Sequence, residues 1–300
     1  MSAQLIDGKS ISADIRNELK HRIADLNKSG IIPGLGVILV GDDPASKSYV
    51  AAKERACESI GIYSDDNRYS SKITENDLLD KIESLNNDPK IHGILVQLPL
   101  PSHINSTLVL NAITPDKDVD GFHPVNVGKM MIGEDSFLPC TPHGIIQLLR
   151  RCNIETRGKH AVVIGRSNIV GKPIANMLFQ KNMDTNATVT ICHTSTNNLK
   201  DFTRNADIII AASGQPNTLT SDMVKPGVVI IDVGVNRVED LSKKNGFRLV
   251  GDVDFNGLFD IASAITPVPG GVGPMTITML LYNTVKSAEK LIERNVQWKK

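Results

Sequence analysis

The feature that most constrains this fold is the alternation of short apolar runs with longer segments of helical periodicity. Residues 34–41 and 91–98 are apolar runs, the pattern of strands buried on both faces of a sheet. Residues 15–26 and 44–59 read as helices, a strand is expected near Ile62, and a capping box opens a further helix after residues 74–77. Strands and helices in turn predict a parallel sheet covered by helices.

The alternation is interrupted once and then resumes. Between residues 114 and 141 the periodicity is weak and prolines are frequent, as expected of a domain junction. Beyond it, residues 161–165, 187–192, 207–212 and 228–232 read as strands and residues 170–180 as a helix. A last helix after Pro274 is long enough to cross back onto the first domain. We therefore expect a two-domain α/β chain.

Composition excludes several classes of function. The 300 residues carry 33 Lys+Arg and 33 Asp+Glu, so no bulk charge favours nucleic acid or an anionic membrane surface. No apolar run approaches the ~20 residues that span a bilayer, and the polar start does not resemble a signal peptide. The 4 cysteines are scattered without a metal-binding spacing, so we expect no metal site. A cytoplasmic location is expected.

Residues 165–173 (GRSNIVGKP) lie between an expected strand and an expected helix, where doubly wound folds bind dinucleotide phosphates. A phosphate-binding P-loop is excluded, because five residues separate Gly165 from Gly171-Lys172 and Pro173 follows. The GxGxxG pattern is also absent. A simple tight turn remains the alternative.

The end of the next strand favours NADP over NAD. NAD enzymes usually place Asp or Glu there to bind the ribose hydroxyls, whereas this chain has His193, Thr194 and Ser195. Together with Arg166, these side chains suit a 2′-phosphate. A solvated strand end is the alternative interpretation.

Tyr49 and Lys53 are four residues apart and share one helical face. Such a pair is often a surface feature, but it is also the catalytic signature of short-chain dehydrogenases. In that family the glycine-rich loop precedes the pair within one domain, so the order here excludes it. Gln97 interrupts an apolar strand near its carboxyl end, where α/β sheets bind ligands, and its amide needs polar partners.

Asp116, Asp118 and Asp120 place three carboxylates at the domain junction. They lack the flanking EF-hand pattern of a calcium loop. A carboxylate is a good acceptor for a planar pair of N–H groups, while a solvated acidic turn is the alternative.

Residues 266–276 (TPVPGGVGPMT) contain three prolines and three glycines in eleven residues, which excludes a helix or a central strand. The apolar helix that follows would direct its free N–H groups at whatever this loop encloses. The run alone fits either a stiff connector or a ligand clamp.

Taken together, these pieces resemble the bifunctional methylenetetrahydrofolate dehydrogenase/cyclohydrolase family, in the family's order and over nearly the whole chain. The matching segments are residues 48–53, 96–101, 116–121, 165–173, 192–193, 232–236 and the Pro-Gly run. The resemblance implies a folate-binding catalytic domain, residues 1–120 plus 276–300, and a Rossmann-like NADP-binding domain, residues 140–270. The active-site cleft would lie between them.

The family's reactions are NADP⁺-dependent oxidation of 5,10-methylenetetrahydrofolate and hydrolysis of the 5,10-methenyl product to 10-formyltetrahydrofolate, in one-carbon metabolism and purine biosynthesis. The resemblance implies that Lys53 is the central acid/base, Gln97 orients it, Tyr49 stacks on folate and Asp120 holds the pterin amino edge. Further substrate-binding residues would be Pro269, Gly270 and Gly273. The cofactor would be bound by Gly165, Arg166, Ser167, His193, Thr194 and Val235. The family is homodimeric.

Two positions depart from the family pattern. Thr194 stands where serine is frequent, and Val235 where isoleucine is common; both keep the chemical character of the position. The rival interpretations are a monofunctional dehydrogenase on the same scaffold, an unrelated NADP dehydrogenase for a small alcohol, and a cofactor-sensing interaction protein. An intact set of Lys53, Tyr49 and Gln97 argues against the first and the last.

Overall fold

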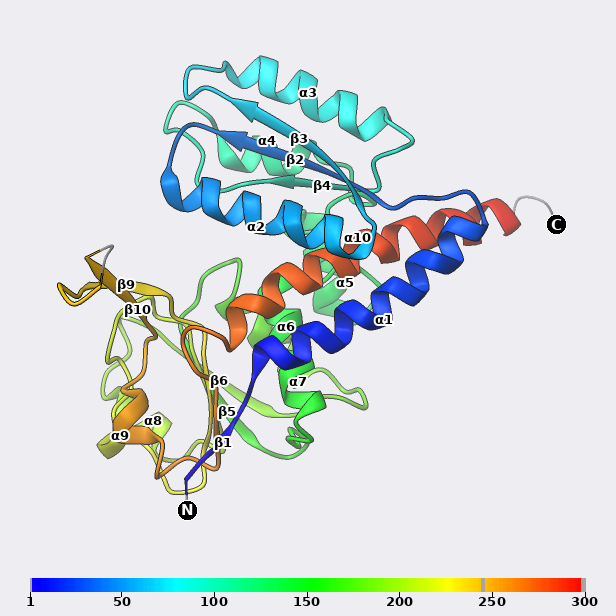
Figure 1. The fold of residues 1–300 in the computed structure, drawn as a ribbon. Helices are drawn as coiled ribbons and strands as arrows, with labels where there is room; N and C mark the ends of the chain where they lie inside the picture. The colour runs from blue at the N-terminus through cyan, green and yellow to red at the C-terminus, as the bar shows by residue number, and fades with distance from the viewer. Residues whose placement is uncertain (1, 244–245, 298–300) are drawn as a thin grey trace. The chain divides into compact units, whose positions relative to one another are not determined.

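The computed structural model describes residues 2–243 and 246–297, and the chain divides into two compact units (Figure 1). The Lys53 unit comprises residues 14–140 and 277–300, and the Gly165 unit comprises residues 1–13 and 141–276. Each unit contains its own parallel sheet. None of the described helices is long and apolar enough to cross a membrane.

The sheet of the Lys53 unit has the strand order β3-β2-β4, with all strands parallel. Its strands are β2 (Gly34–Val40), β3 (Tyr63–Tyr69) and β4 (Gly93–Val96). Its helices are α1 (Gly8–Lys28), which begins in the other unit, α2 (Pro44–Ile60), α3 (Glu75–Asn87), α4 (Ser106–Ala112), α5 (Pro124–Ile132) and α10 (Val272–Gln297). Every residue of β2 and β4 is buried, as their apolar sequences require.

Local sequence explains where the helices of this unit begin. Asp43 caps α2 by accepting the N–H of Ser46, and Pro44 occupies the first turn, where its missing N–H is tolerated. Thr74 caps α3 through the N–H of Asp77. α3 and α4 pack with β2 and β4 around one apolar cluster, while α2 contacts the sheet from the opposite face (Figure 1).

The first helix of the chain, α1, and its last helix, α10, pack against each other within the Lys53 unit. α1 and α10 run side by side (Figure 1), and Arg22 donates two hydrogen bonds to the Glu289 carboxylate while its guanidinium stacks over Tyr282. Arg16 also donates to the hydroxyl of Thr278.

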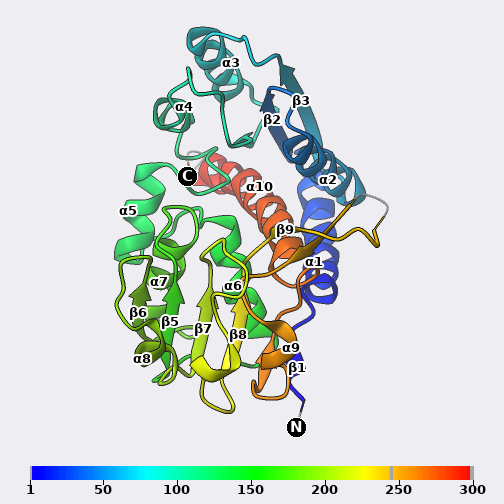
Figure 2. The same cartoon turned by 90° about the vertical axis from the view of Figure 1, so that its left-hand side faces the viewer.

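The Gly165 unit has a six-stranded parallel sheet with the order β1-β11-β8-β7-β5-β6, most of which is visible in Figure 2. Its strands are β1 (Gln4–Leu5), β5 (His160–Ile164), β6 (Thr188–Cys192), β7 (Ile208–Ala211), β8 (Val229–Asp232) and β11 (Ala264–Ile265), and an antiparallel hairpin is formed by β9 (Asn236–Glu239) and β10 (Phe247–Val250). Its helices are α6 (Cys140–Arg151), α7 (Gly171–Phe179), α8 (Leu199–Thr203), the 3₁₀ turn η1 (Ser221–Met223) and α9 (Phe255–Leu258).

The two-domain α/β architecture expected from the sequence is confirmed. Residues 1–13 belong to the Gly165 unit because β1 pairs with β11, whereas the sequence placed them with the first domain. The stretch expected to be an irregular junction contains α5 and the start of α6. The final helix begins at Val272, two residues before Pro274, and its part from residue 277 lies in the Lys53 unit.

Candidate active site

Lys53 and Gln97 form a direct pair at the carboxyl edge of the first sheet. Lys53, on α2 and only 9% exposed, donates from Nζ to Gln97 Oε1 at 3.0 Å. Gln97 follows β4 directly, and its Nε2 donates to Leu98 O at 2.7 Å, which fixes the direction of the amide. The chain goes from β2 to β3 on one side and then returns to β4 on the other side of β2, so the switch point, where such sheets bind ligands, lies between β2 and β4. α2 and Gln97 flank this point.

Tyr49 lies one turn before Lys53 on the same helix, and its side chain is 48% exposed. The phenol ring is therefore accessible beside the buried ammonium group. An exposed aromatic face next to a buried cation suits a planar ligand that stacks on the ring.

Asp120 is coupled electrostatically to Lys53. Burial raises the pKa of the Asp120 carboxyl to about 6, the positive charge of Lys53 opposes this rise, and the negative charge of Asp118 adds to it. The Cys140 thiol donates to Val119 O at 3.3 Å, and burial raises the pKa of this thiol well above its usual range, a rise to which the charge of Asp120 adds. Asp120 is half-buried by exposed area, and a carboxylate in such a place beside an ammonium group is a strong acceptor for N–H donors of a ligand.

Asn283, which the sequence predictions did not include, and Asp118 hold the segment that carries Asp120. Asn283 on α10 donates from Nδ2 to Val119 O at 2.8 Å and to Leu138 O at 3.0 Å. The Asp118 carboxylate, expected as part of an acidic turn, is 2% exposed and accepts the N–H groups of Phe122 and His123. Its role is therefore to shape the turn rather than to bind a cation.

The predicted dinucleotide turn lies at the switch point of the second sheet. From β5 the chain goes to β6 on one side of the sheet and then to β7 and β8 on the other, so the switch point lies between β5 and β7. Gly165 follows β5 directly. Gly165 has φ +125°, and a Cβ there would lie 2.2 Å from Ala212 O, so only glycine fits. Ser167 Oγ accepts the N–H groups of Val170 at 3.1 Å and Gly171 at 3.3 Å and so closes the turn before α7, while Arg166 is exposed.

The remaining predicted cofactor residues are found after the carboxyl ends of other strands of the same sheet. His193 and Thr194 follow β6, and Val235 follows β8 with 49% of its surface exposed. His193 Nδ1 accepts the N–H of Ser195, so the turn after β6 is held by its own side chains. No carboxylate stands at the end of β6, which agrees with the donor set expected for a 2′-phosphate.

The Pro-Gly run belongs to the Gly165 unit up to residue 276. Gly270 has φ +115° and its carbonyl accepts the N–H of Lys9 at 3.1 Å, while Pro269 and Gly273 are exposed. Gly271 closes the turn by donating to Pro267 O at 2.9 Å. The placement of Pro269, Gly270 and Gly273 beside the Lys53 site stays a prediction.

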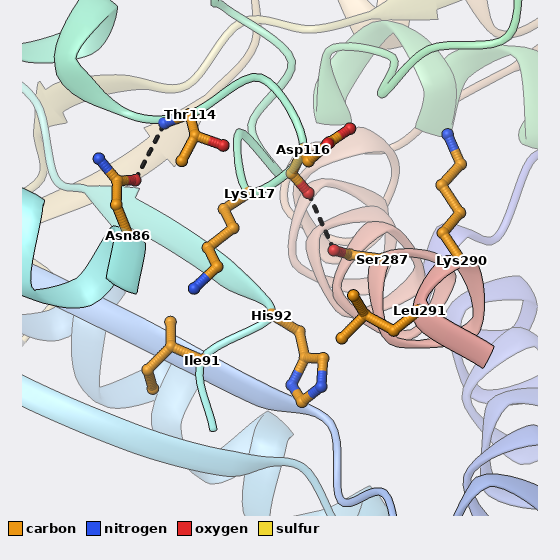
Figure 3. Close-up of a pocket in the computed structure, with 9 residues that line it drawn as sticks. All are labelled: Asn86, Ile91, His92, Thr114, Asp116, Lys117, Ser287, Lys290 and Leu291. Atoms are coloured by element: carbon orange, nitrogen blue, oxygen red, sulfur yellow. Dashed lines mark hydrogen bonds between the residues drawn. The ribbon is translucent and has the colours of Figure 1, made fainter. Parts of the chain in front are cut away.

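A separate cavity of about 200 Å³ lies at the opposite edge of the first sheet, near the amino end of β4 (Figure 3). Its lining includes His92, whose Nδ1 accepts the N–H of Gly34 at 3.0 Å, and Lys117, whose Nζ donates to Leu85 O and Asp88 O. The hydrogen bonds from Ser287 to Asp116 O and from the Thr114 N–H to Asn86 are drawn in Figure 3. These lining groups already form hydrogen bonds within the chain, so they are not available to bind a polar substrate. We therefore assign the active site to the edge of the sheet that carries Lys53.

A buried lysine that hydrogen-bonds a glutamine at the edge of one α/β sheet, and a glycine turn at the switch point of a second, define a two-domain nucleotide-dependent α/β enzyme. The sequence matches two parts of one family: Tetrahydrofolate dehydrogenase/cyclohydrolase, catalytic domain, over residues 6–120, and its NAD(P)-binding domain over residues 139–292. The chain belongs to the tetrahydrofolate dehydrogenase/cyclohydrolase family.

Curated and solved relatives agree with this membership. The chain is 59% identical to the Bifunctional protein FolD of Prosthecochloris aestuarii over 94% of this chain and 97% of that protein. A crystal structure of the bifunctional FolD of Campylobacter jejuni superposes with a TM-score of 0.91 at 52% identity, covering 96% of this chain and 99% of that one. The Trypanosoma brucei enzyme, solved with NADP cofactor and an inhibitor, gives a TM-score of 0.92 at 38% identity, covering 97% and 99%.

Proposed function

We infer that this chain is a bifunctional enzyme that oxidises 5,10-methylenetetrahydrofolate with NADP⁺ and hydrolyses the 5,10-methenyl product to 10-formyltetrahydrofolate. The observation that carries the proposal is the hydrogen bond from buried Lys53 to Gln97, beside Asp120, within a chain that matches both domains of the family. NADP⁺, when bound, accepts the hydride of the first reaction.

In the proposed mechanism the Lys53 unit performs the proton chemistry. Asp120 accepts the amino edge of the pterin, and the ring of Tyr49 stacks on it, so that the one-carbon bridge lies near Lys53 Nζ. Gln97 holds Lys53 in place through Oε1, because its own amide direction is fixed by Leu98 O. Lys53 then assists the addition of water and the ring opening as a general acid/base.

The proposed cofactor site uses Gly165, Arg166, Ser167, His193, Thr194 and Val235. Three features support the fit of NADP⁺ to this site: the glycine-only turn after β5, the exposed guanidinium of Arg166 and the absence of a carboxylate at the end of β6. An arginine pairs with a phosphate through two parallel N–H groups, which favours NADP⁺ over NAD⁺. The hydride step needs alignment rather than an acid.

The test is a pair of spectrophotometric assays on Lys53→Gln. Reduction of NADP⁺ with methylenetetrahydrofolate reports the dehydrogenase, and decay of methenyltetrahydrofolate absorbance reports the cyclohydrolase. We expect the variant to lose about 100-fold or more of the cyclohydrolase rate, the usual size of a general acid/base contribution, and far less of the dehydrogenase rate. Equal loss of both activities with folate binding intact would contradict the assigned role.

Lys47→Gln is the matched control, because Lys47 lies on the same helix but pairs with Asp42 at the surface. We expect it to retain both activities. A wild-type protein that reduces NADP⁺ but leaves methenyltetrahydrofolate decay at the uncatalysed rate would favour the monofunctional dehydrogenase instead.

Arg166→Ala tests the cofactor assignment. Loss of a bidentate phosphate contact is expected to raise the KM for NADP⁺ about tenfold or more while leaving that for NAD⁺ nearly unchanged. Arg157→Ala removes an exposed arginine of the same unit and serves as control. An unchanged preference for NADP⁺ over NAD⁺ in the Arg166 variant would refute the assignment.

We also propose that the enzyme is a homodimer in the cytoplasm. β3 pairs with β2 on one side only, and no described strand pairs with its other edge. Such an edge is a surface to which a second copy of the chain can add. Light scattering distinguishes one chain of 32.6 kDa from a dimer, and fractionation of expressing cells tests the location.

A further inference from the structure

Two buried carboxylates that the proposed chemistry does not use lie at the carboxyl edge of the second sheet. Asp232 ends β8 and is 2% exposed, and Asp252 follows β10 and is fully buried. Among the described residues neither carboxylate has a Lys or Arg at ion-pair distance. A buried charge without an ion-pair partner costs free energy of folding, so stability does not explain these two carboxylates. Their role must lie elsewhere in the molecule.

Asp252 binds the loop that follows β7. Its Oδ2 accepts the N–H groups of Ser213 at 2.7 Å and of Gly214 at 2.8 Å, and the Ser213 hydroxyl at 3.0 Å. Its Oδ1 accepts Asn236 Nδ2 at 2.9 Å, at the start of β9. One side chain therefore connects the loops after two neighbouring strands, β7 and β8.

Asp232 extends this network to the Pro-Gly run. Its Oδ1 accepts the N–H groups of Gly234 at 2.9 Å and Asp252 at 2.8 Å. Its own N–H donates to Thr266 Oγ1 at 2.7 Å, and Thr266 is the first residue of the Pro-Gly run. The two carboxylates thus hold the loops after the adjacent strands β7 and β8, and the backbone N–H of Asp232 joins the loop after β11 to the end of β8.

The backbone is fitted closely around both carboxylates. A Cβ at Gly234 would lie 2.1 Å from Asp252 Oδ1, and a Cβ at Gly251 would lie 1.7 Å from Asp232 Oδ2. Burial raises the pKa of Asp232 to about 6, and the charge of Asp252 adds to the rise, while three backbone N–H donors oppose it. Burial of these carboxylates costs free energy, and the close contacts around them fix the geometry of the backbone.

The loops held in this way border the dinucleotide turn. Ala212, next to Ser213, approaches so closely that a Cβ on Gly165 would lie 2.2 Å from its carbonyl oxygen. Val235, which we assign to the cofactor site, directly follows Gly234. A shift of either carboxylate would therefore move backbone on two sides of the cofactor site.

We propose that Asp232 and Asp252 are positioning residues for the NADP⁺-dependent step, whose carboxylates fix the cofactor-facing loops after β7 and β8 and take no part in the hydrolysis. This inference rests on the proposed function. It predicts an effect confined to the cofactor, because every hydrogen bond of the network lies within the Gly165 unit.

Asp252→Asn is the variant that tests it, because asparagine replaces one acceptor oxygen by an NH₂ group that cannot accept the N–H groups of Ser213 and Gly214. We expect the Kd and KM for NADP⁺ to rise about tenfold or more. The cyclohydrolase rate, measured without NADP⁺, is expected to stay within about twofold. Calorimetric titration with NADP⁺ gives the Kd directly.

Asp254→Asn is the matched control: it removes the same charge two residues away, from a side chain that caps α9 through Gly257. NADP⁺ binding should be unchanged in it. Asn236→Ala, which removes one donor to Asp252 and one to Gly251 O but keeps both carboxylates, keeps the test decisive if Asp252→Asn does not fold; it should weaken NADP⁺ binding in the same direction.

Unchanged NADP⁺ affinity in both Asp252→Asn and Asn236→Ala, or a parallel loss of both activities with a lower melting temperature, would overturn the inference. If wild-type protein binds NADP⁺ but turns over no folate, the proposed function fails while the titrations still decide the inference. Failure of wild-type protein to bind NADP⁺ would overturn both.

Discussion

The carboxyl group of Asp120 lies where water stabilises its charge poorly, and burial raises its pKa to about 6. An acid whose pKa is higher in the folded than in the unfolded state binds protons more tightly when folded. The ionised group therefore costs stability, and this cost develops as pH rises from about 4 to about 6. Nearby Lys53 reduces the cost without removing it.

Asp120→Asn should therefore raise the free energy of unfolding at pH 7 by on the order of 2 kcal/mol, and the gain should shrink as pH falls toward 4. Urea unfolding of wild type and variant between pH 4.5 and 7.5 measures the difference. The same variant should bind folate more weakly, because the amide lacks the charge that accepts the pterin N–H groups.

Asp116→Asn serves as the control, since Asp116 is an exposed residue of the same segment. Its stability difference from wild type should not follow this pH dependence. A pH-independent difference for Asp120→Asn would show that the buried charge is not the cause.

The sequence predicted Lys53 and Gln97 but not the residues that support the site. Gln97 was identifiable because a polar residue at the carboxyl end of an apolar strand points to a ligand edge. Asn283 was not, because its partner carbonyls at Val119 and Leu138 are more than a hundred positions away. Long-range hydrogen bonds to backbone leave no periodicity or spacing that a single sequence displays.

At the scale of elements, the strands and long helices were predicted well and the proline-rich stretch was not. The apolar runs that became β2, β5, β7 and β8 are buried and parallel, as their composition requires. Pro124 was taken as a sign of irregular chain, yet it occupies the first turn of α5 behind a capping His123. Proline favours that position as much as it disfavours a helix interior, so composition alone misled.

The turn between β5 and α7 gives a prediction that belongs to the element rather than to one side chain. Gly165→Ala would introduce a Cβ 2.2 Å from Ala212 O at a backbone with φ +125°. The turn must shift away from β7, so NADP⁺ binding should fall about tenfold or more, with the cyclohydrolase largely retained. Titration with NADP⁺ and the methenyltetrahydrofolate assay measure the two effects.

Gly158→Ala is the control that separates the effect of displacing the turn from the cost of placing alanine at a backbone with positive φ. Gly158 has φ +69° and open space around its Cβ position, so alanine there costs backbone strain of about 1 kcal/mol without a collision. NADP⁺ affinity should be unchanged in this control. Equal affinities for Gly165→Ala and wild type would contradict a dinucleotide turn at residues 165–171.

At the scale of the whole molecule, the chain passes between its two units three times, and each passage lies inside a helix, that at residues 140 and 141 in the first turn of α6. The division falls at residues 13 and 14 within α1, and at residues 276 and 277 within α10. A helix loses hydrogen bonds on both sides of a melted segment, so loss of one unit frays elements of the other. We therefore expect thermal unfolding as a single cooperative transition.

NADP⁺ should shift this transition as a whole. At a free concentration of about 100 times its Kd, a ligand that binds only the folded state adds about 2.7 kcal/mol to the free energy of unfolding. For a chain of 300 residues this corresponds to a rise of roughly 4 °C in Tm. Differential scanning calorimetry with and without NADP⁺ measures it. Two resolved transitions, of which NADP⁺ moves only one, would mean that α1 and α10 do not transmit stability between the units, and the Asp252→Asn variant would then lower the NADP⁺-sensitive transition alone.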